Sequence, residues 1–106
     1  LDQAKDDVPA APAVELPSTR ASYLNNPKPP YPASSKRLGE TGTVLLRVLV
    51  GADGSEERVA LKKSSGFDAL DSSALDTVRR WRFVPGKRNG LPVAMEYTVP
   101  IAFRLE

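Results

Sequence analysis

The segment from Leu91 to Leu105 alternates between apolar side chains and smaller or polar ones, and this pattern constrains the fold more than any other in the sequence. A period of two held over these fifteen residues predicts a long β-strand with one face buried in a core. Such a strand spans roughly 50 Å, since each residue adds about 3.3 Å. The apolar odd positions are Leu91, Val93, Met95, Tyr97, Val99, Ile101, Phe103 and Leu105.

Pro100 lies inside this predicted strand and indicates which side of it is free. A proline removes one donor from the hydrogen-bond ladder, so it is tolerated on an edge strand with its nitrogen turned away from the neighbour. Backbone groups of alternate residues point to opposite sides, so the odd residues bond the neighbouring strand. Thr98, Ala102 and Arg104 then present their backbone groups to the free edge, which is a template for a partner's strand.

The other elements follow from proline, glycine and apolar spacing. We expect a short helix over 32–38, strands over 44–50 and 57–63 joined by a hairpin loop at 51–55, and a main helix over 68–81. The apolar stripe of the main helix consists of Leu70, Ala74, Val78 and Trp81. We expect Ser65 or Asp68 to cap its start, and Arg79 and Arg80 to lie at its end.

A right-handed crossover through the main helix places the last strand beside the first. The sequence therefore predicts an α+β two-layer sandwich: a short helix, then β-β-α-β, with a three-stranded antiparallel sheet in the order 2-1-3 under one main helix. A fourteen-residue helix covers only about 21 Å of a strand this long. The rest of the odd face needs the proline-rich segment, a second copy of the chain, or a bend that shortens the strand.

The first thirty residues differ in composition from the rest. They hold six of the ten prolines, which is typical of a semi-extended linker. We expect residues 1–30 to be a partly disordered Pro/Ala-rich linker and residues 31–106 to be the folded domain. The last residues of the linker are either a plain tether or a segment that docks on the domain or on a partner. No apolar run approaches the roughly 20 residues of a membrane helix, so we expect any anchor to lie upstream.

Composition argues against an enzyme. The chain has no His and no Cys, which excludes a Ser-His-Asp triad, a thiol nucleophile and the usual zinc sites. We expect no catalytic residues, no cofactor and no metal. Capping explains Asp68 and Asp71 better than a metal site does. A basic nucleic-acid site around Trp81 is less favoured than core packing, and the net charge of +2 is too small to indicate nucleic-acid binding.

Six motifs in order resemble the C-terminal domain of TonB-family energy transducers over about residues 28–106. They are Tyr31-Pro32; Gly42 before 44–48; Asp53-Gly54 with Ser64-Ser65-Gly66; 70–74; 81–85; and 90–93 with 99–103. The resemblance implies a periplasmic domain, anchored in the inner membrane by an upstream helix and driven there by an ExbB/ExbD-type motor. Its partners would be outer-membrane transporters for siderophores, haem or cobalamin, whose TonB box adds as a strand to the last strand.

The resemblance also implies a set of partner-binding residues. Some family members carry a cation directly after Tyr-Pro-Ala, where this chain has Ser34, so Lys36 or Arg37 would substitute. A homodimer of the fragment through the last strand is a further expectation, and a TolA-like or other periplasmic envelope adaptor is the alternative function. The implied residues are Thr98, Val99, Pro100, Ile101, Ala102, Phe103 and Arg104 on the last strand, with Lys28, Pro30, Tyr31, Pro32, Lys36 and Arg37 around the Tyr-Pro motif.

Overall fold

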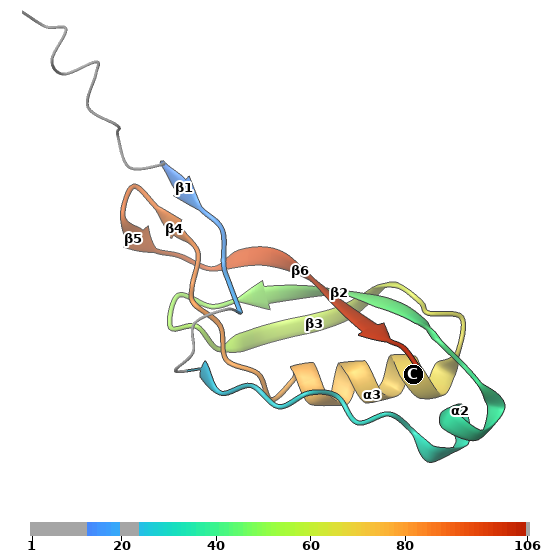
Figure 1. Ribbon diagram of the computed structural model, residues 1–106. Coiled ribbons are helices and arrows are strands. Elements are labelled where there is room, and N and C mark those ends of the chain that lie inside the picture. Colours follow the sequence, from blue (N-terminus) through green and yellow to red (C-terminus); the bar gives the residue numbers. More distant parts are fainter. Residues whose placement is uncertain (1–12, 20–23, 106) are drawn as a thin grey trace, which may run out of the picture.

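The computed structural model describes residues 13–19 and 24–105 and has an α+β fold (Figure 1). The predictions for residues 1–12 and 20–23 therefore lie outside the described residues. Two antiparallel three-stranded sheets have the orders β3-β2-β6 and β1-β4-β5. The elements are β1 (Val14–Glu15), α2 (Ala33–Leu38), β2 (Gly42–Val50), β3 (Glu56–Lys63), α3 (Asp68–Val78), β4 (Lys87–Arg88), β5 (Leu91–Pro92) and β6 (Met95–Phe103).

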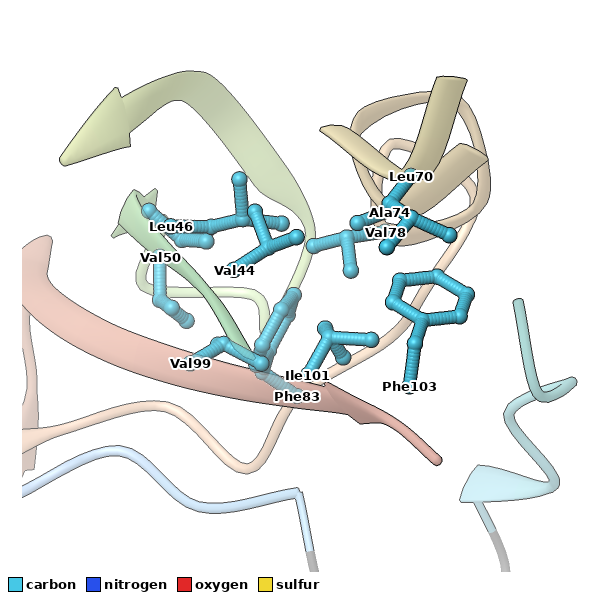
Figure 2. Close-up of a cluster of buried hydrophobic side chains, with 11 residues drawn as sticks. Val44, Leu46, Val50, Leu70, Ala74, Val78, Phe83, Val99, Ile101 and Phe103 are labelled. Carbon is cyan, nitrogen blue, oxygen red and sulfur yellow. The ribbon is translucent and has the colours of Figure 1, made fainter. Parts of the chain in front are cut away.

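The sheet β3-β2-β6, which has the longer strands, packs one face against α3, and the core lies between these two layers (Figure 2). Each strand contributes alternate side chains to that face, because successive residues of a strand point to opposite sides. Leu70, Ala74 and Val78 supply the fully buried stripe of α3, as the sequence predicts. From the sheet and the segment after α3 come Val44, Leu46, Val48, Val50, Phe83, Val99, Ile101 and Phe103.

The order β3-β2-β6 makes the second and last of the predicted strands the two edges of this sheet. The α+β class and the succession of a short helix and then β-β-α-β are confirmed. Pro32 precedes α2 as its N-cap, and Gly39 ends it in a left-handed conformation at a φ of 69°. The short helix is thus confirmed to within one residue.

The prediction of one unbroken strand over 91–105 is wrong. Its first two residues form β5, which pairs with β4 in a separate hairpin, and β6 begins only at Met95. Asn89 and Gly90 have positive φ angles of 52° and 81° and make the tight turn of that hairpin. The N–H of Val93 donates to the carbonyl of Gly86 at 3.0 Å, which extends this hairpin by one pair before the chain passes into β6 of the other sheet. The alternation of apolar and polar residues in the sequence continues from β5 to β6 because the backbone is extended in both strands.

The main helix is also shorter than predicted. It ends at Val78, with Arg79 as its C-cap, so its last turn contains no basic residue. Its N-cap is Phe67, which makes no side-chain capping bond, so the predicted cap by Ser65 or Asp68 is wrong. A carboxylate in the first turn, that of Asp71, reaches back instead and accepts hydrogen bonds from the loop before the helix. Among residues 13–19 and 24–105, no helix has the length and apolar character needed to span a membrane.

Candidate functional site

The outer edge of β6 is free in the described part of the chain, because β6 pairs only with β2. Pro100 lies opposite Leu45 in a register that runs without a shift from Gly42↔Phe103 to Val50↔Met95. A proline fits such an uninterrupted ladder only where the missing N–H would face away from the neighbour. The backbone groups of Thr98 and Ala102 share that orientation, so they point to the free edge.

A groove of about 410 Å³ lies beside this edge. Its second wall is the proline-rich segment, here residues 26–31, which runs along α3 before α2 (Figure 1). The cations among the lining residues are Lys28 and Arg104, and no lining residue is acidic. The groove is lined by Lys28, Pro29, Tyr31, Trp81, Pro100, Ile101, Ala102, Phe103 and Arg104.

Hydrogen bonds from the domain hold the proline-rich segment at several points. The side-chain amide of Asn26 accepts from the N–H of Arg82 and donates to its carbonyl, each at 2.8 Å. The indole N–H of Trp81 donates to the carbonyl of Pro27 at 2.7 Å. The hydroxyl of Ser73 donates to the carbonyl of Pro30. These contacts fix the segment against α3 and the residues that follow it.

Tyr31 joins the proline-rich segment to the core. Its ring packs edge-on against Phe103, with ring centroids 5.3 Å apart, and its hydroxyl donates to the carbonyl of Glu40. The ammonium of Lys36 lies 5.9 Å from the centre of the Tyr31 ring, within the range of a cation–π contact. The Tyr-Pro motif therefore positions one wall of the groove.

The structure brings together seven of the thirteen residues predicted for partner binding. These are Lys28, Tyr31, Pro100, Ile101, Ala102, Phe103 and Arg104, which line the groove. Thr98 and Val99 lie farther along β6. The hydroxyl of Thr98 accepts a hydrogen bond from Lys62, and the side chain of Val99 is buried in the core.

The remaining predicted residues lie outside the groove lining. Pro30 precedes the Tyr-Pro motif and is exposed, and Pro32 is the N-cap of α2. Lys36 and Arg37 lie exposed in the last turn of α2. The role of these thirteen residues in binding stays a prediction, although the groove gathers more than half of them.

The list of predicted partner-binding residues omits two lining residues, Pro29 and Trp81. The sequence places Trp81 in the apolar stripe of the main helix, and in the structure it is half-buried against the core. It follows the end of α3, however, so it also reaches the groove and uses its indole N–H there. The available signal was the polar N–H itself, because a tryptophan near a surface usually finds a partner for that group.

The described residues also include ionisable side chains away from the groove. Within 13–19 and 24–105, no three His, Cys, Asp or Glu side chains gather closely enough to hold a metal ion. The pKa of Asp53 is lowered by hydrogen bonds from the side chain and backbone of Ser55, which belong to the hairpin loop. The absence of a cofactor and of a catalytic site stays a prediction.

The fold and the groove define a small α+β domain that presents a free strand edge beside a docked proline-rich segment. A family of sequences described as "Gram-negative bacterial TonB protein C-terminal" matches residues 27–105. The chain is 51% identical to the protein tonB2 of Pseudomonas aeruginosa over 89 residues, which cover 84% of this chain and 33% of the relative. It is 39% identical to the protein TonB of Vibrio cholerae over 79 residues, 74% of this chain and 32% of that protein.

A solved structure gives the same assignment. The solution structure of the Helicobacter pylori TonB C-terminal domain, residues 194–285, matches with a TM-score of 0.54 and 26% identity. The match covers 72% of this chain and 79% of that one. The chain belongs to the TonB C-terminal domain family. It spans about a third of the length of these two curated relatives.

Proposed function

We propose that this chain is the periplasmic C-terminal domain of a TonB-like energy transducer that binds the TonB box of outer-membrane transporters by strand addition to β6. Full-length members would be anchored in the inner membrane by an N-terminal helix and driven by an ExbB/ExbD-type motor. The energy transmitted would open transporters for siderophores, haem or cobalamin. On this proposal the domain is a coupling module and not an enzyme.

One observation carries the proposal: Pro100 sits in an unshifted ladder, and its side of β6 is unpaired among the described residues. An incoming strand there can bond to the backbone groups of Thr98 and Ala102, and the groove can receive its alternate side chains. Lys28 and Arg104 favour a partner segment with an acidic residue. A strand pulled along its length loads its hydrogen bonds together in shear, which suits the transmission of force.

The test is a titration of the ¹⁵N-labelled chain with a synthetic TonB-box peptide. We expect the backbone amide signals of Thr98 and Ala102 to shift most, because their N–H groups point to the free edge. The amide signal of Arg104, which follows β6 and lines the groove, should shift with them. If another surface moves while these amides stay still, strand addition is wrong. A peptide that produces no shift anywhere would favour the envelope-adaptor alternative.

A pair of variants at one position sharpens this test. Ala102→Pro removes an outward N–H without touching the β2 ladder, since the odd residues face β2. Ala102→Ser keeps the N–H and serves as the control. We expect Ala102→Pro to weaken binding of the TonB-box peptide by about tenfold, and Ala102→Ser to bind as the wild-type chain does. Equal affinities for the two variants would contradict pairing at this residue.

A further inference from the structure

We propose that Asn26 is a positioning residue that clips the proline-rich segment onto the domain, so that the groove has a fixed second wall when the partner strand arrives. The proposal rests on the proposed function, because the groove is taken to be the partner site. Asn26 does not line the groove itself. It would therefore act on affinity only through the residues it holds in place.

The geometry at Asn26 is that of a strand partner supplied by a side chain. Its Oδ1 accepts from the backbone N–H of Arg82, and its Nδ2 donates to the carbonyl of the same residue, both at 2.8 Å. The two residues are 56 positions apart in the chain. Only a side-chain amide offers a donor and an acceptor side by side in this way, because a carboxylate has no donor. Asn is thus matched to this backbone position in a way that Asp is not.

Proline content explains why such a clip is needed. Pro27, Pro29 and Pro30 have no N–H, so this stretch of chain cannot join a sheet by an ordinary ladder. The domain bonds to its carbonyls instead, through Trp81 at Pro27 and Ser73 at Pro30. A polyproline-like segment is stiff, so fixing both ends also fixes what lies between them.

Lys28 and Pro29 are the residues between these ties, and both line the groove. Because this wall of the groove is docked before the partner arrives, binding does not have to supply the entropy cost of ordering it, and the affinity is higher. If the clip is broken, only part of the population has a complete groove, and the apparent affinity falls by that fraction. Asn26 and Ser73 would therefore influence binding without contacting the partner.

The experiment uses the whole 106-residue chain and the same synthetic TonB-box peptide. We compare Asn26→Ala with Ser73→Ala, which breaks the other end of the segment. Ser72→Ala is the matched control, because Ser72 is an exposed serine on the same helix. Affinity is measured from the β6 amide shifts. Hydrogen exchange at the Arg82 amide, whose N–H donates to Asn26, reports whether the clip is closed.

We expect Asn26→Ala to weaken peptide binding by about tenfold and Ser73→Ala by about threefold, with Ser72→Ala unchanged. Exchange at Arg82 should speed up in Asn26→Ala while the core amides of β2 stay protected. Asn26→Asp, which keeps the acceptor and loses the donor, should fall between Asn26→Ala and the wild-type chain.

Two results would overturn the proposal while leaving the proposed function intact. Wild-type affinity in Asn26→Ala, with fast exchange at Arg82, would show that the segment need not be clipped for binding. Unchanged hydrogen exchange at the Arg82 amide in Asn26→Ala would show that Asn26 does not hold the proline-rich segment against Arg82. If the wild-type chain itself shows no peptide-dependent shift in β6, the proposed function has failed, and the positioning role fails with it.

Discussion

Replacing Asp71 tests whether one buried carboxylate holds the start of α3 to the end of β3. Its side chain is only 6% exposed. It accepts the Ser65 N–H at 2.9 Å, the Ser65 hydroxyl at 2.8 Å, and the hydroxyl of Ser64. Burial by itself raises the pKa of Asp71, but the hydrogen bonds from Ser64 and Ser65 outweigh burial and hold the pKa of this carboxyl below its usual range. The folded state therefore favours the charged carboxylate.

The magnitude follows from those three bonds. A hydrogen bond to a charged group contributes about 1.5–3 kcal/mol, and the exposed Ser64 can turn to water when its partner is lost. We expect Asp71→Ala to lower the free energy of unfolding by about 3 kcal/mol. Asp71→Asn, which keeps the shape and one acceptor, should cost about 1–2 kcal/mol.

The sign of the pH dependence is fixed by the direction of the shift. Because the pKa of Asp71 is lower in the folded state, its stabilising contribution is complete above the unfolded pKa and is lost as the pH falls through the folded one. The gap between the wild-type chain and Asp71→Asn should therefore be constant from pH 7 to about pH 5 and shrink below about pH 4.

Urea unfolding followed by the fluorescence of Trp81, the one tryptophan of the chain, measures these differences. Asp76→Asn is the control on the same helix. Asp76 pairs with Arg79 at 3.6 Å on an exposed surface, so its loss should cost less than about 0.5 kcal/mol. Equal losses for Asp71→Asn and Asp76→Asn at pH 7, or a gap that widens toward pH 3, would refute the reasoning.

Three further substitutions test the turns, the core and the edge. Gly54→Ala should lower the free energy of unfolding by more than about 2 kcal/mol, because Gly54 has a φ of 85° and an added Cβ would press on the carbonyl of Phe83. Gly39→Ala should lower it by only about 1 kcal/mol in the same urea assay, because Gly39 has a φ of 69° but open space around it. Leu46→Ala should cost about 2–5 kcal/mol because Leu46 is fully buried, and a loss under 1 kcal/mol would contradict the core as described. Pro100→Ala should leave the urea midpoint unchanged but add an outward N–H donor to β6, so the TonB-box peptide should bind up to about tenfold more tightly. Sedimentation of this variant at high concentration should show whether β6 also pairs with a second copy of itself.

Predictability from sequence depended on whether a feature is local. The main strands, the α3 stripe and the glycine that ends α2 were predictable, because side-chain periodicity and left-handed turns leave marks within a few residues. The small sheet was not, since strands of two residues such as Val14–Glu15 carry no periodicity. The Asn26–Arg82 contact was also beyond reach, because it joins residues 56 positions apart and an asparagine before a proline is an ordinary linker sequence.

The mismatch between strand and helix lengths explains why the proline-rich segment matters to the core as well as to the groove. The bend before β6 leaves nine strand residues, which span about 30 Å, over a helix of eleven residues that covers about 17 Å. Tyr31 takes up part of the difference by packing on Phe103, which is only 4% exposed. One chain thus buries Val99, Ile101 and Phe103 without help from a second copy. A dimer through β6 would therefore rest on backbone pairing at the same edge that we propose for the transporter, so the two would compete for it.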